Sequence, residues 1–283
     1  MTLLHERLAH ARRALVGAGI DPDESAIDAE VLARHVLAWD RGQFLTRGRE
    51  PVPIDLDPRF EQLVARRIAR EPVAYIIGHR EFWGREFEVN SAVLVPRPET
   101  ESVIEEAIED ARGGRPFGII VDVGTGSGCL AVTLAVEFPA ARVFATDISP
   151  ASLEVARRNA SRHGVAERIT FVQGDLLDRV EARADLIVSN PPYVPSADAD
   201  RLQPEVARYE PHSALFGGSD GLAVIRRLFA AAAGHLASDG LLVVEFGFGQ
   251  EADVRGLAHA AGWRVVRIRA DLQGIARTAV LRR

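Results

Sequence analysis

The residues best suited to chemistry form the segment Asn190-Pro191-Pro192-Tyr193, which follows the apolar run at 184–188. An apolar run that ends at strand breakers is typical of a buried strand in a parallel sheet. The prolines fix the backbone, and the first of them holds Asn190 extended. The segment offers a side-chain amide, backbone carbonyls and a flat ring. These groups suit a planar ligand with N–H donors, such as a carboxamide or the exocyclic amine of a base. The alternative is an ordinary turn at a strand end.

A glycine-rich loop at 124–128 supplies a second candidate site, with the pattern D-x-G-x-G-x-G after an apolar run. Glycines let the backbone turn tightly and approach a ligand closely, and the next helix directs its N-terminus at the same place. A dinucleotide fingerprint requires a third glycine at position 129, where Cys129 stands, so a nicotinamide-dependent oxidoreductase is disfavoured. The alternative is a tight turn between a strand and a helix. The candidate residues are Gly124, Thr125, Gly126, Ser127 and Gly128.

Two acidic residues end the next two predicted strands. Asp147 is placed to bind both ribose hydroxyls of a nucleoside, and Asp175 to bind an adenine amino group with Leu176 against the ring. The alternative for each is a helix N-cap, such as Asp147 before the helix that opens at Pro150. Since no lysine and no cluster of arginines lies nearby in the sequence, the expected ligand is an adenine nucleoside that bears no pyrophosphate.

Composition sets the broad class of the protein. The 283 residues are 47% hydrophobic and 26% charged, with a net charge of −6, which is typical of a soluble globular protein of two domains. No apolar run reaches membrane-spanning length and the first residues are too charged for a secretory signal, so we expect a cytoplasmic protein. The absence of a dominant basic cluster weakens a nucleic-acid substrate. The single cysteine excludes an internal disulfide and a cysteine-based zinc site.

The elements that must position these residues fall into three predicted segments. Residues 1–80 are predicted to form a helical domain, since apolar residues recur at helical spacing. Residues 81–97 are predicted to form a β-hairpin linker, with short strands within 82–89 and 92–95 that are joined by Gly84 and Asn90-Ser91. Residues 98–283 alternate strands and helices, which predicts an α/β, doubly wound parallel sheet whose last strand runs antiparallel. The predicted strands are at 118–123, 142–146, 169–173, 184–188, 240–246, 264–268 and 278–281, and the helices at 128–138, 150–163, 220–237 and 250–261.

Taken together, these motifs resemble the class I S-adenosylmethionine-dependent methyltransferases, whose amino-methylating branch carries N-P-P-Y. The flanking motifs resemble the release-factor glutamine methyltransferases, also called HemK or PrmC. The resemblance extends over nearly the whole chain, and its motifs are P-V-A-Y-I-I-G-H-R-E-F-W-G at 72–84, P-R-P-E-T-E at 96–101, Y-E-P-H at 209–212, A-L-F-G-G at 214–218 and D-L-Q-G-I-A-R at 271–277. The resemblance implies a Rossmann-like, seven-stranded methyltransferase sheet behind an N-terminal helical domain that recognises the substrate.

The resemblance also implies the reaction: methyl transfer from S-adenosylmethionine to the side-chain amide nitrogen of the glutamine in the Gly-Gly-Gln loop of peptide-chain release factors. The products are the methylated factor and S-adenosylhomocysteine, and no metal is expected. Asn190 and the Pro191 carbonyl would accept the amide N–H bonds, while Pro192 and Tyr193 would enclose the amide. Asn190 would also contact the cofactor, beside the glycine loop, Asp147, Asp175 and Leu176.

Two other functions fit part of the pattern. A nucleic-acid adenine-N6 methyltransferase shares residues 190–193, and a catalytically silent module would keep only the cofactor site. Other residues are weaker candidates. Cys129 is expected to pack as a small apolar residue. Arg97 and Thr100 are candidates either to line the pocket or to cap a helix. Glu205, Glu210 and His212 are in a loop that could contact the substrate, although loop charges are mostly solvated.

Overall fold

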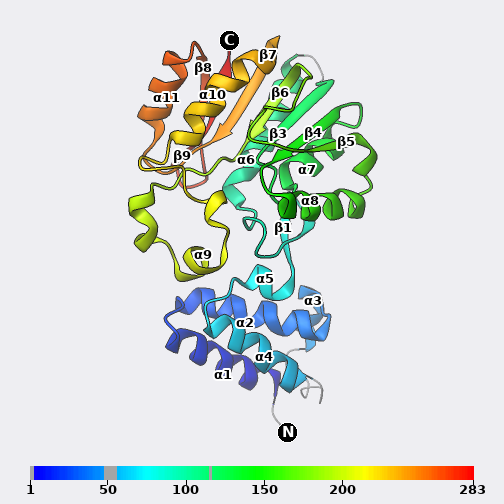
Figure 1. Cartoon of the computed structure of the whole chain (residues 1–283). Helices are drawn as coiled ribbons and strands as arrows, with labels where there is room; N and C mark the ends of the chain where they lie inside the picture. Colours follow the sequence, from blue (N-terminus) through cyan, green and yellow to red (C-terminus); the bar gives the residue numbers. More distant parts are fainter. Residues whose placement is uncertain (1–2, 48–55, 115–116) are drawn as a thin grey trace. The chain divides into compact units, whose positions relative to one another are not determined.

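The structure of the chain is a computed structural model that describes residues 3–47, 56–114 and 117–283. The chain divides into two compact units (Figure 1). The first contains the residues up to Gly78 together with Gln203–Tyr209, and the second contains His79–Leu202 and Glu210–Arg283. Within the described residues, no helix is both long enough and apolar enough to cross a membrane. The predicted division at residues 80 and 97 remains a prediction.

Within the described residues, the regular elements of the first unit are all helices, which agrees with the predicted helical domain, although residues 79 and 80 already belong to the strand His79–Phe82. Its core is apolar and includes Leu15, Leu32 and Phe60. The Asp21 carboxylate accepts hydrogen bonds from the backbone N–H groups of Asp23 and Glu24, which explains why the second helix begins there. The helices are α1 (Leu4–Gly17), α2 (Pro22–Leu37), α3 (Arg41–Arg47), α4 (Leu56–Ile68), α5 (Val73–Ile77) and α9 (Pro204–Tyr209).

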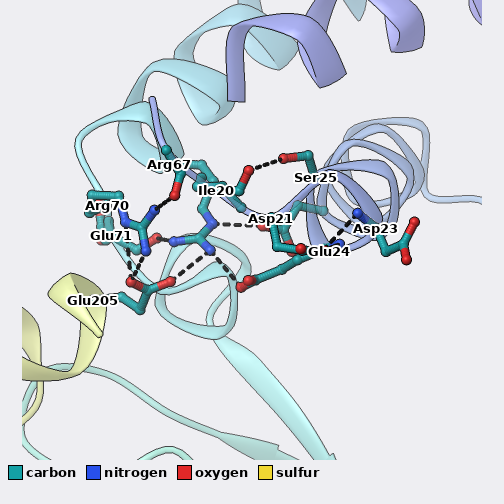
Figure 2. A network of polar contacts seen from close by, with 11 residues as sticks. Ile20, Asp21, Asp23, Glu24, Ser25, Arg67, Arg70, Glu71 and Glu205 are labelled. Carbon is teal, nitrogen blue, oxygen red and sulfur yellow. Dashed lines mark hydrogen bonds and ion pairs between the residues drawn. The ribbon is translucent and has the colours of Figure 1, made fainter. Parts of the chain in front are cut away.

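A buried polar cluster holds α9 in the first unit (Figure 2). Arg67 is 1% exposed and donates hydrogen bonds to Asp28 at 2.7 Å and to Glu205 at 2.9 Å. Arg70 binds the other oxygen of Glu205. Glu205 belongs to α9, so a segment far along the chain closes this cluster. Sequence reasoning did not anticipate that the loop after the Asn190 segment supplies a helix to the N-terminal unit.

The hairpin differs from its prediction. Strands β1 (His79–Phe82) and β2 (Arg85–Glu88) pair antiparallel, and the turn is at Trp83-Gly84, where both residues have positive φ. The predicted second strand at 92–95 is wrong, because those residues form turns and extended loop. The hairpin belongs to the second unit, where Phe82 and Phe87 are buried in the core.

The second unit contains the predicted doubly wound sheet, with seven strands in the order β5-β4-β3-β6-β7-β9-β8. Strands β3 to β7 run parallel, and β9 pairs antiparallel with both β7 and β8, which confirms the expected direction of the last strand. The strands are β3 (Ile119–Val123), β4 (Arg142–Asp147), β5 (Ile169–Gln173), β6 (Ala184–Ser189), β7 (Leu236–Glu245), β8 (Arg264–Ala270) and β9 (Ala276–Arg282).

Helices cover both faces of this sheet (Figure 1). Alternate strand residues point to opposite faces, so Ile120 packs in one apolar cluster and Val121 in the other. The same alternation separates Leu241 from Leu242. One cluster includes helices α6 (Glu101–Gly113), α7 (Cys129–Glu137) and α8 (Pro150–Arg162), and the other includes α10 (Ala223–His235) and α11 (Glu251–Ala260).

Candidate active site

A cavity of about 280 Å³ lies where the parallel strands end. Val123 of β3 pairs with Thr146 of β4 on one side and with Ser189 of β6 on the other. The segments that follow these three strands therefore meet at one edge of the sheet, where open α/β sheets bind ligands. The lining includes nearly every predicted site residue: Gly124, Thr125, Gly126, Ser127, Asp147, Asp175, Leu176, Asn190, Pro191 and Pro192.

A buried carboxylate, that of Asp122, binds the glycine loop at 124–128 and the first turn of α7. Asp122 is inaccessible to solvent, and its Oδ2 accepts hydrogen bonds from the Thr125 hydroxyl at 2.6 Å and from the Ala131 N–H at 3.1 Å. Burial raises the pKa of Asp122 to about 7. Gly128 has a φ of +81°, and a Cβ there would lie 3.0 Å from the Cβ of Ala156. Gly128 thus keeps α7 close to α8 and is not itself part of the cavity lining described above.

Asp147 also binds the backbone of the glycine loop. Its two oxygens accept hydrogen bonds from the backbone N–H groups of Gly126 at 2.9 Å and Ser149 at 2.8 Å. The N-cap of α8 is Ser149 and not Asp147, so the alternative role of Asp147 as a cap is wrong. The backbone N–H of Ile148 also acts on this carboxylate. Since an ionised carboxylate offers about four acceptor positions, at least one remains on the cavity side.

Asp175 is not an isolated charge in this site. It forms an ion pair with Arg227 of α10, and Arg227 also lines the cavity. The sequence predicts no lysine and no cluster of arginines near this position; the fold brings one arginine, Arg227, from 52 positions away, and pairs it with Asp175. Leu176 has a φ of +50°, which is unusual for a leucine. Leu176 lies in the lining beside Asp175 and packs against an apolar cluster, so the surrounding structure must offset this backbone strain.

The Asn190 side chain is oriented by groups from two other elements. Its Nδ2 donates to the Thr100 hydroxyl at 2.9 Å, and that hydroxyl donates to Glu245 Oε2 at 2.6 Å. Arg97 and Thr100 both line the cavity, which confirms the first of their two predicted roles. Glu245 is 1% exposed, and burial raises its pKa to about 7. Sequence reasoning missed Glu245, although a lone carboxylate ending an apolar strand next to β6 was a usable signal.

Tyr193 is held by hydrogen bonds at its ring hydroxyl and at its backbone carbonyl. Its hydroxyl donates to Glu245 Oε1 at 3.2 Å, and its carbonyl accepts from Gln250 Nε2 at 3.0 Å. Among the described residues, Pro191 and Pro192 line the cavity and Tyr193 does not. The ring of Tyr193 is thus tied to the buried carboxylate behind the site. Its role in enclosing a planar amide remains a prediction.

The structure shows which contacts the weaker candidates make. Burial raises the pKa of Cys129 to about 12, so its thiol stays protonated although it lines the cavity. Glu205 is committed to Arg67 and Arg70, and Glu210 to Arg97 at 2.7 Å. Pro211, Ser213 and Ala214 line the cavity from the same loop.

Comparison with solved structures defines the class of protein to which this arrangement belongs. A methyltransferase from Pyrococcus furiosus matches 77% of this chain and 95% of its own, with a TM-score of 0.51 and 20% identity. The ribosomal protein L11 methylase from Lactobacillus delbrueckii subsp. bulgaricus matches 66% of this chain and 80% of its own, with a TM-score of 0.50 and 23% identity. The second unit therefore has a methyltransferase fold, as predicted.

Sequence comparison narrows the class to one family. The family model described as the PrmC N-terminal domain matches residues 6–78, and the one described as the methyltransferase small domain matches residues 103–205. The release factor glutamine methyltransferase of Cereibacter sphaeroides is 45% identical over 95% of both chains. That of Neisseria gonorrhoeae is 44% identical over 90% of this chain and 92% of its own. The chain belongs to the release factor glutamine methyltransferase family.

Proposed function

We propose that this protein transfers a methyl group from S-adenosylmethionine to the side-chain amide nitrogen of the glutamine in the Gly-Gly-Gln loop of peptide-chain release factors. Family membership supports the reaction class and the kind of substrate. The observation that carries the proposal is the site itself. A nucleoside-type pocket and an amide-binding segment meet at the ends of β3, β4 and β6.

The residues present fit an adenosyl cofactor. Gly124 and Gly126 have positive φ, and a Cβ at either position would meet no atom within 4 Å, so these residues border open space. Asp147 lines the cavity and has acceptor capacity left for a ribose hydroxyl, and Asp175 with Leu176 suits the amino edge and face of adenine. The cofactor, when bound, supplies an electrophilic methyl group on a sulfonium.

The protein's task is to orient a weak nucleophile. The lone pair of an amide nitrogen is delocalised into its carbonyl, so the nitrogen must be held in line with the methyl group. Asn190 Oδ1 and the Pro191 carbonyl receive no hydrogen bond from the described residues and can accept the two substrate N–H bonds. These acceptors would orient the nitrogen and stabilise the positive charge that develops on it. The surplus proton leaves after transfer, so no side-chain base is required.

The test is methyl transfer from labelled S-adenosylmethionine to a purified release factor. A factor whose Gly-Gly-Gln glutamine is changed to glutamate is the matched control, with adenine-rich duplex DNA and bulk RNA run in parallel. We expect label in the unchanged factor alone. Asn190→Ala should lower the rate at least about 100-fold, since it removes an acceptor that acts in the transition state. Label in nucleic acid would support the adenine-N6 reaction, and cofactor binding without any transfer would support a silent module.

We further propose that the substrate is a protein in the cytoplasm, and that neither a membrane nor a nucleic acid is a direct partner. The net charge of −6 and the ion pairing of Arg97 and Arg227 with carboxylates support this assignment. Both arginines line the cavity but are already neutralised. A phosphate backbone would find little uncompensated positive charge there.

A further inference from the structure

Three groups from separate elements form a continuous hydrogen-bonded chain behind the candidate active site. Glu245 ends β7, Thr100 precedes α6, and Asn190 follows β6. The distances are 2.6 Å between Thr100 Oγ1 and Glu245 Oε2, and 2.9 Å between Asn190 Nδ2 and Thr100 Oγ1. Ser189 pairs with Val244 in the sheet, so the ends of β6 and β7 hold Asn190 and Glu245 on neighbouring strands.

The direction of each hydrogen bond follows from the number of protons available. An ionised carboxylate can only accept, so the single hydroxyl proton of Thr100 goes to Glu245. The hydroxyl oxygen then has only lone pairs to offer. Asn190 must present its NH₂ group there, because its carbonyl oxygen would face a lone pair.

This constraint decides which end of the Asn190 amide faces the cavity. The two ends of an asparagine amide are nearly the same size and exchange by a half-turn about one bond, so packing alone selects weakly between them. In one orientation Oδ1 is available to accept a substrate N–H. In the other, Nδ2 would meet that N–H and repel it. Only the first orientation supports the proposed reaction.

We infer that Glu245 and Thr100 are positioning residues that fix the Asn190 amide with Oδ1 toward the substrate. The inference rests on the proposed function and adds to it how the Asn190 side chain is oriented to accept the substrate N–H. Glu245 also accepts from the Tyr193 hydroxyl, at 3.2 Å, so one buried carboxylate holds both ends of the segment 190–193.

The ionisation of Glu245 gives the inference a pH signature. Burial raises the pKa of Glu245 to about 7, the nearby charge of Glu99 acts in the same direction, and hydrogen bonds from Thr100 and Tyr193 and the charge of Arg277 oppose it. Once protonated, the carboxyl group has a proton to donate to Thr100. The Thr100 hydroxyl can then donate its proton to Asn190, and the Asn190 amide is no longer held with Oδ1 toward the cavity. Turnover should therefore decrease as the pH falls through about 7.

The experiment compares kcat and KM for release-factor methylation across a set of variants. Thr100→Val replaces the hydroxyl by a methyl of similar size and should lower kcat about 100-fold with little change in KM. Glu245→Leu should have the same effect. The conservative substitutions Thr100→Ser and Glu245→Gln should each keep kcat within about fivefold of wild type. In Glu245→Gln, the amide oxygen can accept from Thr100 while its NH₂ group donates to the Tyr193 hydroxyl oxygen.

The matched control is Thr278→Val. Thr278 pairs with Glu245 in the sheet, and its hydroxyl bonds Ser102 at 2.5 Å without reaching Asn190. This variant loses a buried hydroxyl beside the same carboxylate and should keep its kcat. Equal losses in Thr100→Val and Thr278→Val would overturn the inference, because they would show a general packing effect.

Two further outcomes separate this inference from the proposed function. If Thr100→Val and Glu245→Leu fail to fold, the pH profile of Glu245→Gln decides. The inference requires that the wild-type step in kcat near pH 7 disappear in this variant, and an unchanged step would overturn it. If the wild type methylates the release factor and Thr100→Val does so equally well, the inference is overturned and the proposed function stands. A wild type without that activity would overturn both proposals.

Discussion

Protonation decides the roles of single residues in this site. Cys129 lies in the cavity lining, but burial raises the pKa of its thiol to about 12, so almost no thiolate exists at neutral pH. Thiolate is the nucleophilic form of cysteine. A covalent mechanism through Cys129 is therefore disfavoured. The remaining candidates for a role in the reaction are the residues that act through hydrogen bonds.

Cys129→Ser should keep kcat within about threefold of wild type, since the residue supplies no nucleophile. The measurement is the methylation rate at pH 7.5, accompanied by alkylation of the wild-type thiol with iodoacetamide. Alkylation of the folded protein should be slower than that of the urea-unfolded protein by at least about tenfold. A variant without activity, or a rapidly alkylated native thiol, would contradict this assignment.

Gly217 shows how closely the backbone packs behind the segment 190–193. A Cβ at this position would lie 2.5 Å from the Pro192 carbonyl oxygen, a backbone atom that cannot swing away. Gly217 also donates its N–H to the Val194 carbonyl at 3.0 Å. The glycine at 217 therefore allows the loop to pack closely against the segment 190–193, which we propose binds the substrate amide.

Gly217→Ala should lower kcat by about 100-fold, because a displacement of about 1 Å in the segment 190–193 misaligns the substrate amide. Gly256→Ala is the matched control, since Gly256 lies within α11 and a Cβ there meets no atom within 4 Å. That variant should keep full activity. The measurement is kcat for both proteins, with their circular dichroism spectra to verify folding. A Gly217→Ala protein of normal activity would show that the close packing is not required.

At the scale of elements, α9 depends on a buried ion cluster more than on its own sequence. A helix of six residues is too short to be stable alone. It is held because Glu205 binds Arg67 and Arg70 (Figure 2). Although burial acts to raise it, hydrogen bonds from its own backbone N–H and from both arginines hold the pKa of Glu205 below its usual range.

Arg67→Met should destabilise the first unit by about 3–5 kcal/mol, since it leaves Asp28 and Glu205 as buried carboxylates without their shared partner. The backbone amides of α9 should also exchange hydrogen for deuterium faster, because its anchor is lost. Arg34→Met is the control, because Arg34 pairs with Glu30 at 3.6 Å on a partly exposed helix face. It should change stability by less than about 1 kcal/mol. Unchanged exchange in α9 would show that the cluster does not hold it.

For the whole molecule, two buried carboxylates should make stability depend on pH. Burial raises the pKa of both Asp122 and Glu245 to about 7, above the values near 4 expected for the unfolded chain. The folded state therefore binds more protons than the unfolded state between pH 4 and 7. Their contribution to the free energy of unfolding is fully present below about pH 4 and is lost as the pH rises through 7.

The fall in unfolding free energy between pH 5 and pH 8 should be smaller in Asp122→Asn than in wild type, by roughly 2 kcal/mol. The asparagine oxygen can still accept from Thr125 and Ala131, so the glycine loop keeps its support. Urea denaturation of both proteins at the two pH values is the measurement. Parallel pH dependence in the two proteins would show that Asp122 is not the titrating group.

Local pattern was enough to determine the order and type of most elements. Several strands of the sheet contain a short run rich in apolar residues that is soon followed by glycine or proline, as at 119–123 before Gly124 and at 184–189 before Pro191, so they were recognisable. The junction predicted at Gly84 is the hairpin turn, where Trp83 and Gly84 both have positive φ, whereas the strand predicted at 92–95 is wrong. The short helices α3, α5 and α9 are held by tertiary contacts and were not predicted.

The sequence alone determined the chemistry that this protein can perform, because glycines, carboxylates and the Asn-Pro-Pro-Tyr segment follow strands whose carboxyl ends must meet in a parallel sheet. Tertiary structure decided how those groups are held. Arg227 reaches Asp175 across 52 residues, Glu245 and Thr100 reach Asn190 from other elements, and Glu205 reaches Arg67 across 138. Hydrogen-bond direction and charge pairing depend on neighbours in space, and no spacing along the chain specifies them.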